Sequence, residues 1–441
     1  MTPVVTAPDR ARTAAVLATL AVTGYVTVTV WASSRLGYES WSLLVLVPFL
    51  LVVGGLLVAR SQVARQDPWV LQVALLALGV KLLCGVLRYL MAWKLYDGSD
   101  AGTYHEFAVR HAEEYRALDF SSFAGVPGTG WIYVVTSAVY ALTGPTMVGG
   151  YVVYAFAGFW GQWFAYLGFR HGVPHGLHRR YALLVLLLPS LAFWPSALGK
   201  DAWMQLSIGT ALLGTGLVAS GRARGWAVLA LGLFGAWLVR PHISGLVGVA
   251  VAGGLALRRP AVTTQLTPVA RGVTLLAVAG AAAWMASVGA GFVGAESLQA
   301  ADLQSALRDA SGRTEQGGSE FTPVPFLSPL GPAAAALTVL FRPLPFEAHN
   351  LQSLVAASET AVLLWLTWCW RWSLWRAVKA LRENVFVAAC LLGTVLFVAA
   401  LSEFANFGIL ARQRAQLLPL FLVLLCLPAL PSRPRPPGRP T

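Results

Sequence analysis

Charged residues are scarce in this chain of 441 residues. Asp, Glu, Lys and Arg make up 12% of it, whereas hydrophobic residues make up 57%. A soluble domain carries roughly 25% charged residues, so this composition excludes an ordinary water-soluble protein. Apolar runs of roughly 20 residues recur, the length that a helix needs to cross a hydrocarbon layer about 30 Å thick. The alternating pattern of membrane β-strands is absent. The sequence therefore predicts an all-α, multi-pass transmembrane helical bundle.

Cysteine is also scarce. The chain has 4 of them, each inside an apolar run, so no disulfide framework is expected: Cys84, Cys369, Cys390 and Cys426. The first apolar run, Ala14–Trp31, is too long for a cleaved signal peptide and is expected to remain as a span. A Walker loop, a dinucleotide-binding fingerprint, a CxxC pair and an HExxH motif are missing, so the chemistry that these motifs carry is not indicated.

About twelve apolar runs qualify as spans. They cover approximately residues 12–32, 40–59, 69–92, 148–168, 181–197, 202–219, 225–239, 243–257, 272–293, 351–369, 385–402 and 415–430. Basic residues gather in the links on one side of this arrangement. The positive-inside rule makes that side cytoplasmic and places both termini there. The net charge of +13 is therefore a topology signal of a plasma (inner) membrane protein, and no nucleic-acid partner is expected.

Two short apolar pieces do not fit the count of spans. Trp131–Leu142 and Pro332–Leu340 are shorter than a span, and counting Trp131–Leu142 as one would invert every basic link that follows. We expect both to be juxtamembrane helices of the outer face. Two long outer loops, 93–147 and 294–350, then belong to a single transmembrane domain, 1–430. The Pro-rich tail, 431–441, is expected to be a disordered, basic cytoplasmic segment.

An acidic, aromatic stretch follows the third span. Asp97, Asp100 and Glu106 are carboxylates that could serve as a general base, and Asp97, Asp100 and His105 could together hold a divalent metal cation. Tyr104 could supply a flat surface for a sugar or a lipid head group. The alternative is an ordinary exposed loop, because Asp-Gly-Ser-Asp is also typical of a turn.

Two further outer turns carry charge. Lys200 and Asp201 lie between two spans and are either part of a site or a local ion pair in a solvated hairpin. Arg240 and His242 flank Pro241 between two short spans. An arginine at the outer boundary needs an anionic partner, and the planar guanidinium matches a lipid phosphate. The alternatives are a snorkelling arginine and a histidine at a helix end.

Arginines also precede the last span. Arg412 and Arg414 lie on the outer side, against the positive-inside bias, which favours an anion-binding role. The alternative is simple pairing with Glu403. Arg342 is a weaker candidate of the same kind. Carboxylates and arginines on one side of the membrane suit a site where a lipid-linked phosphate meets a polar acceptor.

The order of these features resembles the GT-C superfamily of membrane glycosyltransferases, which includes the protein O-mannosyltransferases and the lipid A aminoarabinose transferase. The segment Asp100–Ala108 looks like the acidic motif in the first outer loop of that family. Gly128–Tyr133, continued by Tyr140–Gly144, is similar to its juxtamembrane stretch, and Lys200-Asp201 falls where a second acidic motif is expected. A weaker likeness links the chain to bacterial polysaccharide polymerases.

The resemblance implies an enzyme that moves a sugar, with inversion, from a polyprenyl-phosphate donor to an envelope glycan, lipid or protein acceptor on the outer face. Asp100 is the preferred base or metal ligand, with Asp97 and Glu106 as substitutes and Asp201 assisting. The phosphate would be bound by several cationic or polar side chains: Lys200, Arg240, His242, Arg342, Arg412, Arg414 and Tyr104. Two alternatives stay open, an oligosaccharide-repeat polymerase that uses lipid diphosphates and a transporter or flippase of lipid-linked sugar.

Overall fold

The fold is helical throughout the part of the chain that is described. The structure, a computed structural model, describes residues 7–95, 99–123, 125–259, 272, 276, 280, 321, 328–348, 351–402 and 404–428. These residues form helices joined by short turns and contain no strand. The predicted all-α class is therefore confirmed for them. The predicted span at 272–293 and the predicted tail at 431–441 lie outside the described residues.

The helices follow one another closely. In the first half they are α1 (Ala7–Leu36), α2 (Glu39–Trp41), η1 (Ser42–Leu46), α3 (Val47–Arg60), α4 (Gln62–Gln66), α5 (Pro68–Leu95), α6 (Ser99–Arg116), α7 (Thr129–Thr143), α8 (Met147–Gly172), α9 (His178–Leu187), α10 (Pro189–Phe193) and η2 (Trp194–Ser196). In the second half they are α11 (Lys200–Ala219), α12 (Arg224–Trp237), α13 (Pro241–Leu257), α16 (Gly331–Phe341), η3 (Pro345–Glu347), α17 (Leu351–Cys369), α18 (Arg371–Lys379), η4 (Ala380–Arg382), α19 (Val385–Leu401) and α20 (Phe407–Leu424).

Four of these helices are long and apolar enough to cross a membrane, or up to six if each bent pair counts as one span. The four comprise Glu39–Arg60, Pro68–Trp93, α11 and α20. The bent pairs are α7 with α8, at 111°, and α17 with α18, at 63°. The chain is thus a helical protein with several candidate spans, and the total of twelve remains a prediction.

Two predicted spans differ from the observed helices. The run 181–197 is not one helix, because α9 ends at Leu187 and Pro189, which lacks a backbone N–H, begins α10. The last span was expected at 415–430, yet α20 starts at Phe407. Asn406 caps this helix by accepting hydrogen bonds from the backbone N–H groups of Gly408 and Ile409. The arginines that were expected before the last span therefore lie within its helix.

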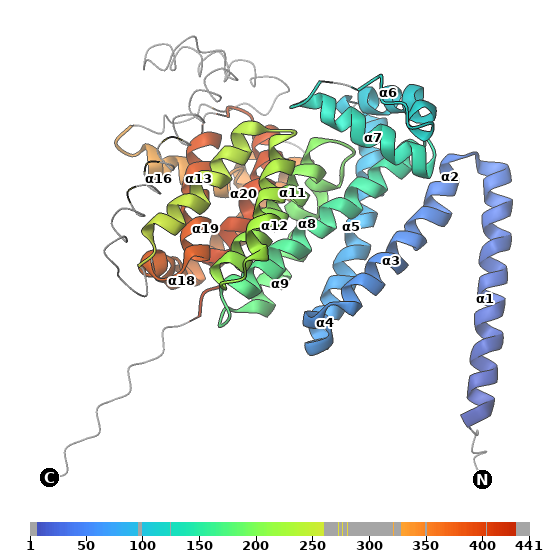
Figure 1. Ribbon diagram of the computed structural model, residues 1–441, viewed down its shortest axis with the longest axis horizontal. Coiled ribbons are helices and arrows are strands. Elements are labelled where there is room, and N and C mark those ends of the chain that lie inside the picture. The colour runs from blue at the N-terminus through green and yellow to red at the C-terminus, as the bar shows by residue number, and fades with distance from the viewer. Residues whose placement is uncertain are drawn as a thin grey trace.

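Close packing of α8, α11 and α12 forms the centre of the bundle, where these helices run side by side (Figure 1). Gly161 and Gly168 of α8 meet the backbone of α11, and Gly209 and Gly216 of α11 meet that of α8. A Cβ at any of these positions would collide with the partner backbone, which is why small residues are found where membrane helices approach closely.

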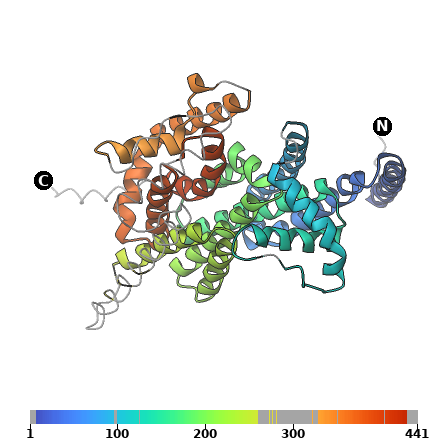
Figure 2. The ribbon, with the colours of Figure 1, turned by 90° about the horizontal axis from the view of Figure 1, so that it is seen from above.

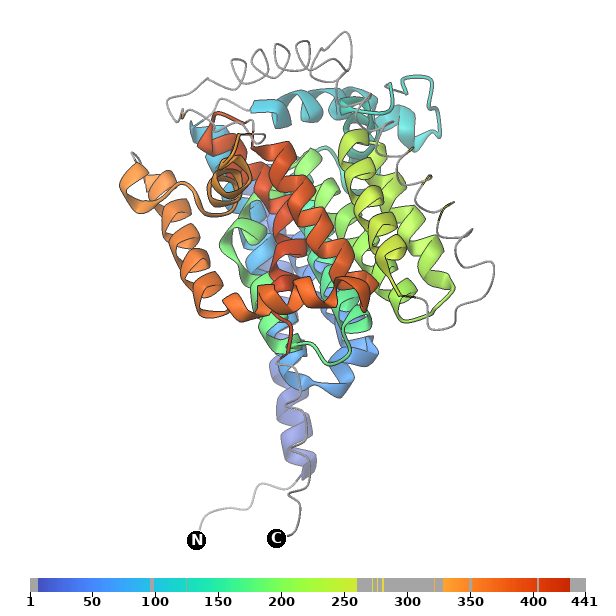
Figure 3. The same ribbon diagram turned by 90° about the vertical axis from the view of Figure 1, so that its left-hand side faces the viewer.

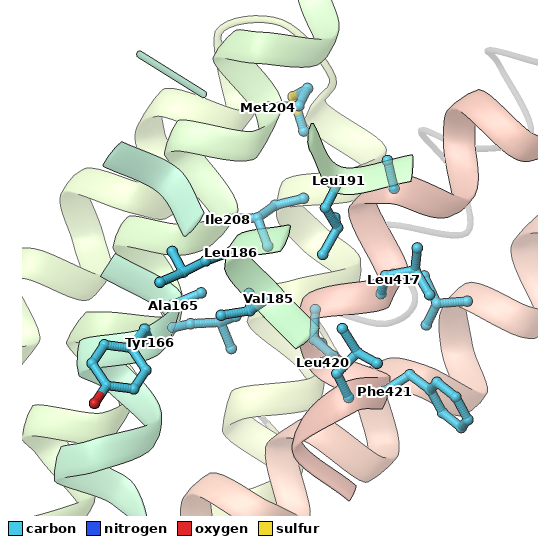
Figure 4. Close-up of a cluster of buried hydrophobic side chains, with 14 of the residues drawn as sticks. Ala165, Tyr166, Val185, Leu186, Leu191, Met204, Ile208, Leu417, Leu420 and Phe421 are labelled. Carbon is cyan, nitrogen blue, oxygen red and sulfur yellow. The ribbon is translucent and has the colours of Figure 1, made fainter. Parts of the chain in front are cut away.

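A second layer of packing joins this centre to the C-terminal helices. Ala165, Val185, Leu191 and Ile208, from α8 to α11, are buried together with Leu417, Leu420 and Phe421 of α20 (Figure 4). Helix α1, in contrast, stands apart from the other helices (Figures 1 and 2) and exposes many of its apolar side chains. Such exposure suits lipid rather than water.

The two ends of the bundle carry different charges. Helices α6 and α7 cover one end, here named the acidic face because α6 carries Asp100 and Glu106 (Figures 1 and 3). The opposite end, named the basic face, holds α4, the start of α9 and α18, with Arg65, Arg179 and Arg371. The end of α20 reaches the basic face as well, because the backbone N–H of Leu177, just before α9, donates to the Cys426 carbonyl at 2.9 Å.

Candidate functional site

The centre of the site is a buried carboxylate held by two guanidinium groups. The Asp201 side chain, at the start of α11, is only 3% exposed. Its Oδ1 lies 3.4 Å from Nη2 of Arg240, and its Oδ2 accepts a short hydrogen bond from Nε of Arg412. The side chains of Arg240 and Arg412 are 14% and 34% exposed. Because both carboxylate oxygens are engaged, Asp201 is suited to positioning the two arginines.

Local sequence brings these three residues together. Gly199 adopts φ +141° immediately before α11, a conformation that an L side chain rarely adopts. Arg240 occupies the turn between α12 and α13, where Pro241 is the first helical residue. Arg412 lies in the second turn of α20, after the Asn406 cap. The prediction that Asp201, Arg240 and Arg412 share one side of the bundle therefore agrees with their geometry.

Two glutamines extend the cluster along α20. Oε1 of Gln413 accepts hydrogen bonds from Nη1 of Arg240 at 2.7 Å and from Nε2 of Gln416 at 2.6 Å. Sequence reasoning did not select either glutamine. The available signal was a polar run, Arg412 to Gln416, inside an apolar helix, where polar groups usually serve a site or a packing contact.

Arg88, within α5, is a further member of the site that sequence reasoning did not select. Its guanidinium lies over the rings of Phe193 and Trp194, 5.0 and 5.1 Å from their centroids. It is also close enough to Asp201 to act on that carboxylate electrostatically. The aromatic residues just before Lys200 thus hold a third arginine near the centre of the site.

The acidic stretch reaches the same place through α6. Asp100 is exposed in the first turn of this helix, and its charge acts on Lys200 and Arg412. The ring of Tyr104 is buried so closely against Gly199 that a Cβ there would lie 3.1 Å from Cε2 of the tyrosine. Burial, followed by the charge of Asp100, raises the pKa of Tyr104, so its hydroxyl stays protonated and can donate a hydrogen bond.

Aromatic rings of α7 line the site beside α6 and α11. Tyr133 packs against Tyr104 with 5.5 Å between ring centroids, and Trp131 packs against Trp203 at the same distance. Nε1 of Trp203 donates to the Gly235 carbonyl at 2.7 Å, which fixes the ring on α12. Flat aromatic surfaces next to charged groups are suited to polar ligands with apolar faces.

Some buried polar atoms of this region have no hydrogen-bond partner among the described residues. They include Nε1 of Trp131, both polar side-chain atoms of Gln205, one turn after Asp201, and Oε1 of Gln416. Buried polar atoms in native proteins are nearly always paired, with protein, water or ligand. These donors and acceptors would therefore suit a ligand that carries hydroxyl groups.

An apolar groove lies between α12 and α13, the two helices that are joined by the turn carrying Arg240. It has a volume of about 280 Å³ and is lined on α12 by Leu233, Phe234 and Trp237, and on α13 by Ser244, Gly245, Gly248 and Val249. The backbone N–H of Ser244 donates to the Arg240 carbonyl at 3.2 Å, so the groove begins one helical turn after Arg240 along the chain. A chain of apolar groups could lie in this groove.

Other predicted residues lie elsewhere. Glu106 is 70% exposed and pairs with Arg110, 3.7 Å away on the same helix. Nδ1 of His105 is 2.7 Å from the Tyr140 hydroxyl, and burial lowers the pKa of His105, which favours the neutral ring. His242 follows Arg240 by two residues and is half-buried in the first turn of α13.

Arg342 and Arg414 form a second cluster away from Asp201. Arg342 pairs with Glu347 and lies over the Phe321 and Phe407 rings. Arg414 is 1% exposed and donates to the carbonyls of Leu340 and Arg342, at 3.2 and 2.8 Å. Both arginines thus hold the end of α16 against α20 in this structure, and their phosphate-binding role stays a prediction.

A metal site is not assembled by the described residues. Among them, no group of three or more His, Cys, Asp and Glu side chains is close enough to hold a metal ion. Two predicted participants, Asp97 and Glu403, lie outside the described residues. The predicted metal set of Asp97, Asp100 and His105 therefore stays a prediction.

Taken together, the site offers cationic donors, a carboxylate near them, aromatic rings and an adjoining apolar groove. This arrangement can bind an amphiphile with an anionic head and can bring a polar second substrate to the same place. No family model, no curated protein and no solved structure matches this chain.

Proposed function

We propose that the protein is a membrane glycosyltransferase that takes a sugar from a polyprenyl-phosphate donor. The observation that carries this proposal is the pair of arginines on Asp201, one of which, Arg240, lies in the turn between the two helices that line an apolar groove. Arg240 and Arg412 would bind the donor phosphate through the donors that Asp201 leaves available, and the groove would take the first part of the polyprenyl chain. Fixed guanidinium groups stabilise a leaving phosphate because they need no rearrangement during reaction.

The transfer itself needs a base and a leaving group. The hydroxyl of the acceptor attacks the anomeric carbon, and the bond from that carbon to the phosphate oxygen breaks with inversion. The acceptor proton passes to the Asp100 carboxylate, and the polyprenyl phosphate leaves on Arg240 and Arg412. Asp100 is suited to this role because it is exposed near Lys200 and Arg412, without an ion-pair partner among the described residues.

The sugar would lie between the rings of Tyr104, Tyr133 and Trp131 and the amide of Gln205. Aromatic faces pack against the C–H groups of a sugar, and the amide offers both a donor and an acceptor to its hydroxyls. The acceptor would be an envelope glycan, lipid or protein that reaches the site from the acidic face, which we propose to be the outer side of the membrane.

The proposed membrane arrangement is GT-C-like. The acidic face would be the outer side and the basic face the cytoplasmic side, with about twelve spans and both termini in the cytoplasm. The sharp angle of 111° between α7 and α8 supports α7 as a juxtamembrane helix of the outer face. The plasma membrane is the proposed location.

The test is a turnover assay in nanodiscs. Wild-type protein would receive radiolabelled polyprenyl-phosphate sugars and an envelope acceptor fraction, beside Asp100→Asn and the matched control Asp119→Asn, an exposed acid of the same face. Transfer by wild type and by Asp119→Asn, but not by Asp100→Asn, supports the proposal. Transfer that survives in Asp100→Asn contradicts the role of this carboxylate. Lengthening of lipid-diphosphate oligosaccharides instead would indicate a repeat polymerase.

One observation favours a second function, the transport of a lipid-linked sugar. The segment from α9 to α11 is discontinuous, and buried charges meet the break. Nζ of Lys81 donates to the Leu191 carbonyl at 2.6 Å, and Glu359 accepts from the Ser190 backbone N–H at 2.8 Å. Broken helices with such partners are typical of transporters. Movement of labelled lipid-linked sugar across sealed vesicles, without new glycosidic bonds, would establish this function in place of transfer.

A further inference from the structure

A second pocket lies on the basic face, at the opposite end of the bundle from Asp201. Its volume is about 470 Å³, and its lining is almost entirely charged or polar: Asp67, Arg170, Leu177, His178, Arg179 and Arg180. The residues come from the link before α5, the end of α8 and the start of α9. This pocket takes no part in the proposed glycosyl transfer.

The pocket is electropositive. Arg179 is held by Asp67 through two hydrogen bonds of 3.2 Å, and this pairing lowers the pKa of Asp67 and keeps the carboxylate ionised. The pocket therefore holds three guanidinium groups and one carboxylate, which gives it a net charge of about +2. Guanidinium groups arranged around a cavity are suited to a phosphate, because each offers paired donors to its oxygens.

Other contacts fix the pocket in place. The guanidinium of Arg180 stacks on Trp370, 4.0 Å from the ring centroid, and donates to the Leu425 carbonyl at 3.2 Å. The guanidinium of Arg179 lies over Trp69 at 5.3 Å. The side chain of His178 is hydrogen-bonded to the Val173 carbonyl at 2.8 Å. Arg179 and Arg180 are thus oriented before any ligand binds, which lowers the entropic cost of binding.

Helix α18 indicates the depth at which the pocket lies relative to the membrane. This helix bends away from α17 by 63° at Trp370, exposes Trp372 and Trp375, and buries Ser373 against the end of α20. Exposed tryptophans beside Arg371 and Lys379 are typical of a helix that lies in the membrane interface. Because Arg180 stacks on Trp370, the pocket lies at this same level, where lipid head groups are found.

We propose that this pocket binds the phosphate-bearing head group of an anionic membrane lipid. Arg170 and Arg180 contact the phosphate, and Arg179 contributes in competition with Asp67. The apolar chains of the lipid pass over the neighbouring Leu177 and Trp370. Basic pockets between membrane helices bind anionic lipids in this way, and the interfacial level of the pocket favours a lipid over a soluble phosphate.

Native mass spectrometry of the full chain in detergent tests this proposal, with phosphatidylglycerol titrated against phosphatidylcholine. We expect phosphatidylglycerol to bind preferentially. Arg170→Gln/Arg180→Gln should weaken binding at least about tenfold, because each cation near the surface contributes to the attraction of an anionic lipid. Arg371→Gln/Arg382→Gln is the matched control, since it removes the same two charges from the same face outside the pocket, and it should bind as wild type does.

A variant that is expected to bind more tightly provides a test that misfolding cannot imitate, because a misfolded protein would lose binding. Asp67→Asn retains the side-chain oxygen that accepts from the Trp69 backbone N–H at 3.2 Å, but it removes the charge that competes for Arg179. It should bind phosphatidylglycerol about fivefold more tightly than wild type. Equal binding by wild type, Arg170→Gln/Arg180→Gln and Asp67→Asn would overturn the proposal. Displacement of the lipid by an equal concentration of inorganic phosphate would overturn the assignment to a lipid.

Discussion

Two arginines of α20, separated by one residue, lie in very different regions of the molecule. Arg412 shares the Asp201 carboxylate with Arg240 and remains 34% exposed. Arg414 is buried and bonds to the carbonyls at the end of α16. Two residues correspond to a rotation of about 200° around an α-helix, so neighbouring arginines point to opposite sides. The same type of side chain is therefore proposed to bind a ligand in one region, whereas it holds helices together in the other.

The largest expected effect separates these two arginines. Arg412→Gln should reduce transfer about 100- to 1,000-fold, because one donor to the leaving phosphate is lost. Arg414→Gln should leave the turnover of each folded molecule close to that of wild type and should lower the thermal midpoint, since carbonyls near α16 lose their donor. Turnover and thermal unfolding in the same detergent measure both quantities. Equal loss of turnover in the two variants would contradict the comparison.

Asp201→Asn should produce the next largest effect. The amide cannot balance the charges of Arg240 and Arg412, so the two guanidinium groups move apart and transfer falls about 100-fold. The partly buried arginines also lose their buried carboxylate, which costs about 3–5 kcal/mol of stability. Asp67→Asn serves as the control, because its carboxylate pairs with the exposed Arg179. Transfer at the wild-type rate in Asp201→Asn would show that the carboxylate does not position the arginines.

Substitution of two glycines should separate an effect on transfer from an effect on stability alone, here at the level of the backbone. Gly199→Ala introduces strain at φ +141° and presses on Tyr104, so transfer should fall about tenfold. Gly221 also has a positive φ, +77°, but a Cβ there has open space around it. Gly221→Ala should cost about 1 kcal/mol of stability and leave transfer unchanged. The ratio of turnover between these variants is the measurement, and a ratio near one would exclude a special role for the Gly199 turn.

The smallest expected effect concerns the contact between α16 and α20, where Arg342 pairs with Glu347. Burial tends to raise the pKa of Glu347, but hydrogen bonds from Arg342 and the Leu344 backbone outweigh it and lower this pKa overall. The resulting stability is therefore present above the ordinary glutamate pKa, about 4.3, and is lost as pH falls through the lower pKa of the folded state. Between pH 6 and 3, the free energy of unfolding derived from thermal denaturation should decline less in Arg342→Gln than in wild type, by about 1 kcal/mol. Parallel declines would show that this pair does not contribute.

Much of the fold and part of the site were predictable from composition and pattern. Apolar runs predicted the helical class, and outer-side charges selected Asp201, Arg240 and Arg412 before their contacts were known. The different role of Arg414 was not predicted, because the last span was expected to begin at residue 415. Recognition of Asn406 as a helix cap would have placed both arginines on one helix, on opposite sides.

Other parts of the site depend on tertiary packing that local patterns do not contain. Gln413 belongs to the site because α20 approaches the turn that carries Arg240, and no spacing along the chain encodes that approach. The break at Pro189 was hidden by the uniform hydrophobicity of the run around it. Hydropathy measures transfer into lipid and does not register the loss of one backbone donor.

The most direct test of the account is equilibrium binding of a polyprenyl monophosphate, without sugar or acceptor, to wild type, Arg412→Gln and Arg414→Gln in nanodiscs. The account predicts that wild type and Arg414→Gln bind with similar affinity and that Arg412→Gln binds at least about tenfold more weakly. Equal affinity for all three proteins would contradict the claim that the Asp201 cluster binds the lipid phosphate.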